Sequence, residues 1–183
     1  MSSFMKKTSA KQFDLPKLVF TDIDGVWTDG GMYYTESGDE LKKFNTSDSA
    51  GILFLKLMGI PTVIITGEQT AMVERRGRKL GVALIKTGVR NKLELAKEIC
   101  QQRNISLQEC AFIGDDINDI NLLHAVGISA CPVNAPSYIK SDVDWVIDVQ
   151  GGSGAFRAFV ERLLAPGNLL KEALNRYLVG LEQ

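Results

Sequence analysis

The chain of 183 residues has the length of a single domain. Its 21 Lys plus Arg residues nearly balance 22 Asp plus Glu residues, and the net charge of −1 does not favour binding to nucleic acid or to an anionic membrane surface. The hydrophobic fraction of 45% is enough for a buried core, yet no apolar run approaches the ~20 residues of a membrane-spanning helix. The first residues lack the apolar stretch of a secretory signal, so we expect a cytoplasmic protein with a flexible arm at 1–16.

Cysteine and histidine are too few to support several kinds of catalysis. The three cysteines, Cys100, Cys110 and Cys131, are widely spaced and are typical of buried thiols in a reducing compartment. His124 is the single histidine, which nearly excludes Ser-His-Asp, Cys-His and His-rich zinc sites. If the chain is an enzyme, we expect carboxylates to carry its proton transfers.

The N-terminal half of the chain alternates short β-branched runs with longer amphipathic stretches. Ser47 is expected to be the N-cap of the first helix. The predicted elements are a buried strand at 17–21, a hairpin with arms at 32–35 and 41–44, a helix at 48–58, a second buried strand at 62–66 and a helix at 70–80.

The C-terminal half continues this alternation, and Asn91 and Glu94 have the spacing of a capping box. Strands that alternate with helices predict an α/β fold, a Rossmann-like doubly wound parallel sheet whose ligands bind beyond the carboxyl ends of the strands. The predicted elements are strands at 83–85, 111–113, 127–130 and 145–149, and helices at 92–103, 117–125, 155–164 and 167–181.

Two carboxylates leave the first predicted strand together. Asp22-Ile23-Asp24-Gly25 follows that strand directly, so both acids can face one small volume as the chain enters a glycine turn. The same pattern is also typical of a plain turn, in which Asp side chains bond to their own backbone.

A cluster of acids follows the strand that ends near Gly114. Asp119 lies one helical turn from Asp115 and Asp116, and three such acids raise one another's pKa values unless a cation lies among them. Because no His or Cys is nearby, these oxygens favour Mg²⁺ over zinc. A single acid at this position would be explained as a helix N-cap.

Two further positions offer a hydroxyl and a lysine. Thr66 and Gly67 end the second strand, where a hydroxyl and backbone N–H groups can hold a phosphate oxygen, although Thr-Gly is also typical of a turn. Lys92 occupies the first position of a helix, where the helix dipole disfavours a cation, so it is either a solvated or a functional lysine.

Two carboxylates, a hydroxyl, a lysine and an acidic group thus follow one another on successive strand ends. In this order they resemble the four motifs of the haloacid dehalogenase-like phosphotransferase superfamily. The resemblance covers a phosphatase domain at 17–165 and leaves 166–183 as a C-terminal helical tail.

The resemblance implies a role for each motif. Asp22 would attack phosphorus and become an aspartyl phosphate, while Asp24 would act first as general acid and then as general base. Thr66 and Lys92 would stabilise charge on the phosphoryl oxygens, with Gly67 beside them.

The resemblance also implies a Mg²⁺ cofactor. The ion would be held by Asp22, by the Asp24 backbone carbonyl and by Asp115, with Asp116 and Asp119 in support. It would let an anionic nucleophile approach an anionic phosphate.

A receiver domain of two-component signalling is the alternative outside the enzyme class. It also combines an acidic pair, a Thr and a Lys around a phosphorylated Asp, but there the adjacent acids follow the first strand and the phosphorylated Asp is a lone Asp in the middle of the chain. In this sequence the adjacent acids Asp115 and Asp116 come late in the chain instead, and this reverse order favours the phosphatase. A receiver would stay phosphorylated for minutes after treatment with acetyl phosphate.

The segment from Gly25 to Thr46 has room for a hairpin but not for the cap domain that many relatives insert over the site. An open site excludes water poorly and offers few contacts to a substrate, and a neighbouring subunit can supply both. We therefore expect a homo-oligomer, with the hairpin at 32–44 at a subunit contact.

Three longer stretches, 22–30, 44–51 and 151–157, narrow the resemblance to a capless, tetrameric branch that dephosphorylates sugar acids. This branch contains phosphatases of 3-deoxy-D-manno-octulosonate 8-phosphate, which serve lipopolysaccharide synthesis, and of the nine-carbon acids ketodeoxynonulosonate and N-acetylneuraminate 9-phosphate, which serve sialic-acid-type synthesis. The octulosonate enzymes typically carry Arg directly after the Thr-Gly of the second motif, where this chain has Glu68. Glu68 favours a nine-carbon substrate, with octulosonate 8-phosphate as the alternative.

Arg76 and Lys79 share one face of the helix predicted at 70–80. They either meet a sugar-acid carboxylate in their own or a neighbouring subunit's site, pair with Glu68, or form a solvated basic face. The resemblance further implies that Asp48 lies near the substrate pocket.

Overall fold

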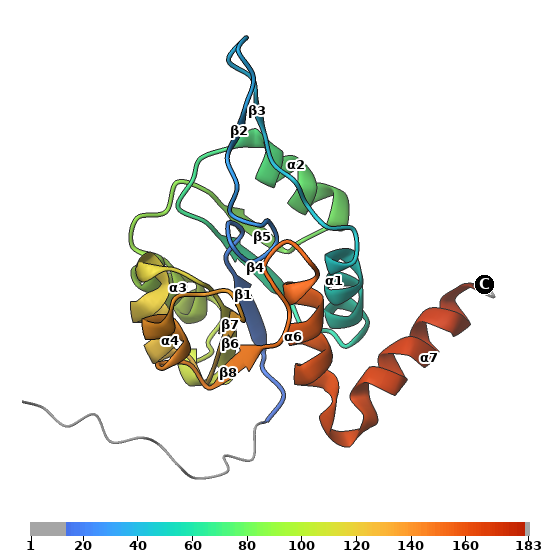
Figure 1. Cartoon of the computed structure of the whole chain (residues 1–183). Coiled ribbons are helices and arrows are strands. Elements are labelled where there is room, and N and C mark those ends of the chain that lie inside the picture. Colours follow the sequence, from blue (N-terminus) through green and yellow to red (C-terminus); the bar gives the residue numbers. More distant parts are fainter. Residues whose placement is uncertain (1–13, 182–183) are drawn as a thin grey trace, which may run out of the picture.

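A computed structural model describes residues 14–181 and contains a six-stranded parallel sheet in the order β5-β4-β1-β6-β7-β8 (Figure 1). The prediction of a doubly wound parallel sheet is therefore confirmed. The strands are β1 (Leu18–Thr21), β4 (Thr62–Ile65), β5 (Leu84–Lys86), β6 (Cys110–Ile113), β7 (Ile128–Pro132) and β8 (Trp145–Ile147).

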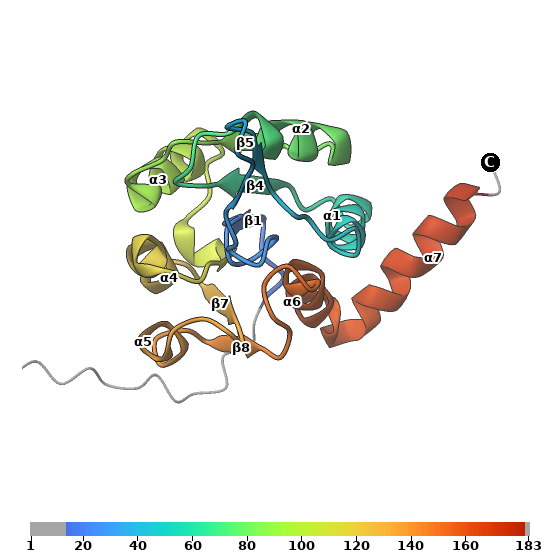
Figure 2. The same ribbon diagram turned by 45° about the horizontal axis from the view of Figure 1, so that its top comes forward.

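Helices cover both faces of this sheet, as Figure 2 shows along its edge. One face carries α1 (Asp48–Leu57), α2 (Ala71–Leu80) and α6 (Ala155–Leu164). The opposite face carries α3 (Lys92–Gln102), α4 (Ile120–Ala125) and the short α5 (Ser137–Lys140), which the sequence pattern does not predict.

The alternation of side chains along β1 explains why two cores form. Val19 points into the core with α1 and α6, whereas Leu18 and Phe20 point into the core with α3 and α4. Every residue of β1 is buried, because a central parallel strand is covered on both faces. Burial of both faces therefore fixes the position at which β1 ends and Asp22 follows.

The connections place β1 and β6 at a switch point of the sheet. From β1 the chain continues to β4 and β5 on one side, and it then crosses to β6 on the other side of β1. Loops that leave neighbouring strands in opposite directions open a crevice at the carboxyl ends of those strands. Asp22 follows β1 and Asp115 follows β6 by two residues, so both reach this crevice.

Several helix ends differ in detail from their predicted form. Ser47 precedes α1, but its hydroxyl donates to Asn45 Oδ1 at 2.9 Å and makes no cap bond, because Ser47 already has helical backbone angles. Asn91 accepts the Glu94 N–H at 3.2 Å as a cap should, while the Glu94 carboxylate pairs with Lys97 instead of returning to Asn91. The helix predicted at 117–125 begins with a 3-10 turn at Ile117–Asp119.

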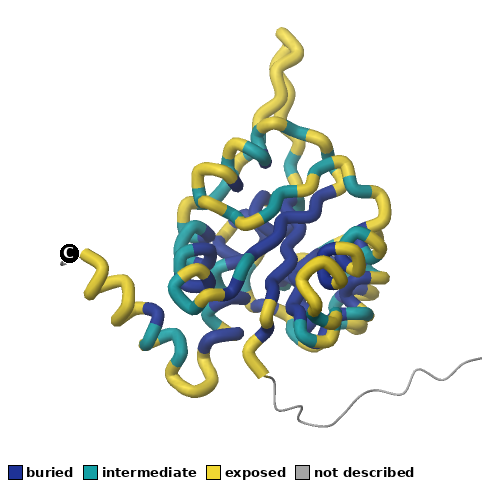
Figure 3. The backbone as a smooth tube through the Cα atoms, turned by 180° about the vertical axis from the view of Figure 1, so that it is seen from behind, coloured by how far each residue is buried: buried dark blue, intermediate teal, exposed yellow. Residues whose placement is uncertain are grey.

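Two segments project from the body of the fold, and both are largely exposed, drawn in yellow in Figure 3. The first is the hairpin of β2 (Tyr33–Tyr34) and β3 (Glu40–Leu41), which is shorter than predicted and takes the place of a cap domain. The second is α7 (Leu169–Leu181), which buries Ala173 and extends outward. Residues 1–13 of the arm expected at 1–16 lie outside the described residues. Within 14–181, no helix has the length and apolar character needed to span a membrane.

Candidate active site

Residues of three of the four predicted motifs line one cavity of about 390 Å³ at the carboxyl ends of β1, β4 and β6, and Lys92, the remaining motif, binds Asp22 from outside this lining. Carboxylates dominate its walls, with amides, a hydroxyl and glycine backbone between them. The lining residues are Asp22, Asp24, Gly25, Asp29, Gly30, Thr66, Gly67, Glu68, Asp115, Asp116, Asn118 and Asn134.

Lys92 is buried beneath this cavity, 1% exposed, and binds two carboxylates. Its Nζ lies 2.8 Å from Asp22 Oδ2 and 2.6 Å from Asp119 Oδ1. Burial alone would lower the pKa of Lys92, but the charges of Asp22 and Asp119 outweigh burial and raise that pKa. The unfavourable helix dipole at this position is thus compensated by two ion pairs, which also fix the orientation of Asp22.

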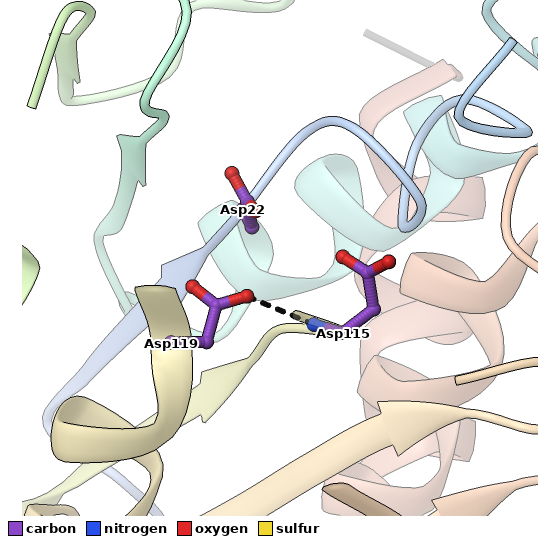
Figure 4. A group of neighbouring side chains, drawn as sticks. All are labelled: Asp22, Asp115 and Asp119. Atoms are coloured by element: carbon purple, nitrogen blue, oxygen red, sulfur yellow. Dashed lines mark hydrogen bonds between the residues drawn. The ribbon is translucent and has the colours of Figure 1, made fainter. Parts of the chain in front are cut away.

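Asp22, Asp115 and Asp119 converge on one small volume (Figure 4), where one oxygen of each lies within 4.8 Å of the others. Asp119 is held by the N–H groups of Asp115 at 2.9 Å and Asp116 at 3.2 Å. Asp22 Oδ1 and Asp115 Oδ1 are buried and accept no hydrogen bond within 14–181. Buried carboxylate oxygens without a partner, in a group this compact, fit a hard divalent cation such as Mg²⁺.

The pKa values of these acids also indicate a place for positive charge. Burial, and then the neighbouring carboxylates of Asp22, Asp119 and Asp116, raise the pKa of Asp115 to about 8. Burial and the charge of Asp119 likewise raise the pKa of Asp22, against the lowering effect of Lys92. A divalent cation would reverse this repulsion and favour both carboxylates in their charged form.

Asp24 is placed beside Asp22 but in a different environment. It is half-buried, and its Oδ1 accepts from the Thr28 hydroxyl at 3.2 Å and from the Lys42 ammonium. Lys42 also forms an ion pair with Glu68 on the facing wall. Asp22 is therefore fixed from within the protein, whereas Asp24 is held from the hairpin side.

Two glycines let the surrounding loops approach this site. Gly25 has a φ of 77°, and a Cβ there would lie 1.9 Å from Asp115 Oδ2. A Cβ on Gly151 would lie 1.8 Å from the Gly25 carbonyl oxygen, so the glycine-rich loop at 151–154 packs directly on the Asp22–Gly25 turn. Glycine is needed at both positions because backbone and carboxylate occupy the space of a side chain.

Thr66 is 1% exposed, and Thr66 and Gly67 lie on the wall beyond β4, while Asp116 caps the following turn through the Ile117 N–H at 2.7 Å. The predicted motif residues Lys92 and Asp119 do not line the cavity, but they bind the lining residues Asp22 and Asp115.

Three predicted substrate-binding residues do not line this cavity. Asp48 is fully buried and accepts the Arg157 N–H at 3.0 Å, and burial raises its pKa to about 6. Arg76 donates to Ser49 Oγ at 2.9 Å and to the Asn45 carbonyl at 3.3 Å, so Glu68 pairs with Lys42 and not with Arg76. Lys79 is exposed on α2.

Sequence reasoning missed four residues around the site: Lys42, Asp29, Asn118 and Asn134. Asn118 belongs to the acidic motif and Asp29 follows the Asp22–Gly25 turn closely, so proximity to the motifs is a signal that was available for both. Lys42 and Asn134 reach the site only through the folding of the hairpin and of the loop after β7, and their local sequence carries no comparable signal.

Comparison with known proteins identifies the family of this chain. A family model of haloacid dehalogenase-like hydrolases matches residues 83–159. The 3-deoxy-D-manno-octulosonate 8-phosphate phosphatase KdsC of Haemophilus influenzae is 34% identical over 148 residues, which cover 81% of this chain and 82% of that protein. The chain belongs to the haloacid dehalogenase-like hydrolases. KdsC of Escherichia coli K12 is also 34% identical, over 86% of this chain and 84% of that protein.

Solved structures agree with this assignment. A probable YrbI family phosphatase from Pseudomonas syringae has a TM-score of 0.86 and 36% identity, over 90% of this chain and 93% of that chain. The 3-deoxy-D-manno-octulosonate 8-phosphate phosphatase of Moraxella catarrhalis was solved with magnesium, phosphate and KDO. It has a TM-score of 0.85 and 33% identity, over 88% of this chain and 93% of that chain. This haloacid dehalogenase-like chain is thus a hydrolase of the phosphatase type, as its motifs predict.

Proposed function

We propose that this haloacid dehalogenase-like enzyme hydrolyses the phosphate monoester of a 2-keto-3-deoxy sugar acid through an aspartyl phosphate on Asp22. The observation that carries the proposal is the buried Lys92, which fixes Asp22 Oδ2 at 2.8 Å and leaves Oδ1 without a hydrogen bond within 14–181. A carboxylate oriented from one side and open on the other is suited to in-line attack on phosphorus.

The proposed reaction has two steps, formation of the aspartyl phosphate and its hydrolysis. The Asp22 carboxylate forms a bond to phosphorus while the phosphorus–oxygen bond to the sugar breaks, and Asp24 gives its proton to the leaving alkoxide. Asp24 then takes a proton from a water molecule that attacks the aspartyl phosphate, which releases phosphate and restores Asp22. Thr66 and Lys92 stabilise charge on the phosphoryl oxygens.

Asp22, Asp115 and the Asp24 backbone carbonyl would hold the Mg²⁺ cofactor, with Asp116 and Asp119 supporting them. When bound, the ion neutralises charge between the nucleophile and the phosphate. The orphaned oxygens of Asp22 and Asp115 support this ligand set, and the Moraxella relative was solved with magnesium.

The relatives favour 3-deoxy-D-manno-octulosonate 8-phosphate as the substrate. The phosphatases from Haemophilus, Escherichia and Moraxella are all named for this eight-carbon acid and cover most of the chain. They support this assignment better than the nine-carbon substrate that the sequence motifs favour.

One observation keeps the nine-carbon acids as a second candidate. Glu68 lines the cavity directly after Thr66-Gly67, at the position where the resemblance expects Arg in octulosonate enzymes. A carboxylate accepts hydrogen bonds from sugar hydroxyls, whereas a guanidinium donates, so this exchange changes what part of a substrate the wall prefers.

The deciding experiment measures phosphate release from octulosonate 8-phosphate, ketodeoxynonulosonate 9-phosphate and N-acetylneuraminate 9-phosphate side by side. EDTA and Asp22→Asn serve as controls for metal and nucleophile. A higher kcat/KM for the 8-phosphate supports the relatives' substrate, and a higher value for a 9-phosphate supports the interpretation of Glu68. Absence of Asp22-dependent turnover on all three would contradict the proposed function.

Arg76 and Lys79 are proposed to recognise the carboxylate of the sugar acid at a site shared between subunits. Both lie on α2 outside the cavity of their own chain, and Arg76 is held toward α1 by Ser49 and Asn45. We expect Lys79→Ala to raise KM about tenfold for the sugar-acid phosphate and to leave KM for p-nitrophenyl phosphate nearly unchanged. Equal changes in the two KM values would contradict this role.

A further inference from the structure

Lys42 is the point at which the exposed hairpin reaches into the active site. It directly follows β3, and residues 32–41 before it are all exposed, yet the Lys42 side chain is only 2% exposed. Its ammonium forms ion pairs with Asp24 Oδ1 and Glu68 Oε2. A lysine so deeply covered at the base of an exposed hairpin has given up most of its hydration for these two carboxylates.

These contacts constrain the Asp24 carboxylate. Lys42 and the Thr28 hydroxyl both bind the same oxygen, Asp24 Oδ1, from two directions. The carboxylate therefore cannot rotate freely about its side-chain bonds. The hairpin itself has a further attachment, since the Tyr33 hydroxyl donates to Asp29 at 2.9 Å.

We propose that Lys42 is a positioning residue that holds the Asp24 carboxylate in place for proton transfer and links it to the substrate-facing Glu68. This inference rests on the proposed aspartyl-phosphate mechanism, in which Asp24 protonates the leaving group. Because Lys42 follows β3, the position of the hairpin is thereby coupled to the acid of the reaction. A segment that lies outside the sheet thus takes part in catalysis through one buried side chain.

The leaving group of the substrate separates this role from a purely structural one. An alkyl phosphate releases a strongly basic alkoxide and needs the proton from Asp24, whereas p-nitrophenyl phosphate releases a weakly basic phenolate and does not. Hydrolysis of the aspartyl phosphate is common to both esters, so the comparison uses kcat/KM, which reports the steps up to loss of the leaving group. Displacing Asp24 therefore lowers kcat/KM for the alkyl ester and not for the aryl ester. Damage to the whole site slows both esters alike.

The test compares Lys42→Met with Lys42→Arg and with the neighbouring Lys43→Met as a matched control. Lys43 is exposed and lies 3.8 Å from Asp29, so its removal leaves Asp24 untouched. The substrates are the fastest alkyl phosphate from the substrate comparison and p-nitrophenyl phosphate. We expect Lys42→Met to lower kcat/KM for the alkyl ester at least about tenfold and for the aryl ester less than about threefold. Lys42→Arg should recover most of the loss, and Lys43→Met should match the wild type.

Asp24→Asn supplies the second readout. If Lys42 acts through Asp24, Lys42→Met causes no further loss on the alkyl ester once Asp24 is replaced. Similar losses on both esters, or additive losses in the double variant, would overturn the inference while leaving the phosphatase mechanism intact.

A crystal structure of Lys42→Met tests the same point without activity. An Asp24 carboxylate that keeps its wild-type position in that structure would overturn the inference even if the proposed function itself failed. A carboxylate that turns away from its wild-type position would support it.

Discussion

At the scale of single residues, Lys92 shows how strongly the site depends on paired charges. The side chain is buried and its two partners, Asp22 and Asp119, are buried as well. Removing one partner of such a group leaves uncompensated charge in a medium of low dielectric constant. We therefore expect Lys92 to contribute to stability as well as to the proposed reaction.

We expect Lys92→Met to lower the free energy of unfolding by about 3–5 kcal/mol at pH 8 in EDTA, and to abolish turnover. Lys97→Met is the matched control, because Lys97 forms an exposed pair with Glu94 on the same helix and should change stability by less than about 0.5 kcal/mol. Urea unfolding followed by circular dichroism measures both variants. Equal, small changes would show that the buried pairs contribute little.

The raised pKa of Asp115 makes a prediction about pH. Between the ordinary pKa of 3.8 and the raised value of about 8, the folded chain keeps a proton that the unfolded chain has lost. The unfolded state then binds fewer protons, so the free energy of unfolding falls as pH rises through this range. In EDTA, we expect the Tm to fall as pH is raised from about 4 to about 8, and Mg²⁺ to restore it at pH 8.

Calorimetry of the wild type and Asp115→Asn in EDTA tests this expectation. The variant cannot ionise at this position, so its Tm should vary less with pH, and Mg²⁺ should stabilise it less. Parallel Tm curves for the two proteins would show that Asp115 does not titrate as its burial implies.

At the scale of elements, the glycine-rich loop at 151–154 packs on the Asp22–Gly25 turn and leads into α6. Gly151 packs on the Gly25 carbonyl, and the Asn45 side chain donates to the Gly152 carbonyl at 3.1 Å. The Arg157 N–H in the first turn of α6 binds Asp48 at the start of α1. Asp48 thus joins two helices of the core, whatever its part in substrate binding.

Gly151→Ala is expected to lower the free energy of unfolding by about 1–3 kcal/mol and to reduce kcat, because a Cβ there forces the loop at 151–154 away from the Asp22–Gly25 turn. Gly180→Ala in α7 is the control of opposite sign: nothing lies within 4 Å of the added Cβ, and helix propensity favours alanine. Urea unfolding compares the two variants. An unchanged midpoint for Gly151→Ala would contradict the close packing of this loop.

At the scale of the whole molecule, exposed apolar side chains gather on the two segments that leave the body. Met32, Tyr33, Tyr34 and Leu41 lie on the hairpin, and Leu174, Leu178 and Leu181 lie on α7. Such apolar surface is typical of an interface between subunits. It supports the expectation of a homo-oligomer in which a neighbouring subunit covers the open site.

In sedimentation at assay concentration we expect the wild type to be an oligomer, and Tyr34→Glu to raise the dissociation constant at least about tenfold, because the substitution places a charge on the apolar hairpin. Tyr138→Glu on α5 is the matched control, since Tyr138 is also exposed but lies on the body. A monomeric wild type would contradict the proposal, and so would equal dissociation of the two variants.

The sequence by itself determined the fold class, the order of the strands along the chain and the four motifs that meet at the cavity. It could do so because burial on both faces leaves β-branched runs such as 62–65, and because motifs at strand ends need only the parallel topology to meet. The family follows from the same local signals. Element ends such as Ser47 and the 3-10 turn at 117–119 were less predictable, because neighbouring backbone decides which cap bond forms.

Only the tertiary structure decided which charges are partners. From sequence, Lys92 is either solvated or functional, and its burial between Asp22 and Asp119 becomes visible only when β1, α3 and the turn after β6 are brought together. Glu68 pairs with Lys42, which is 26 positions earlier in the chain and carries no motif, instead of with Arg76 on the adjacent helix. The reason is physical: hydrophobic periodicity is a local property, whereas ion pairs depend on distances between side chains that are remote in sequence.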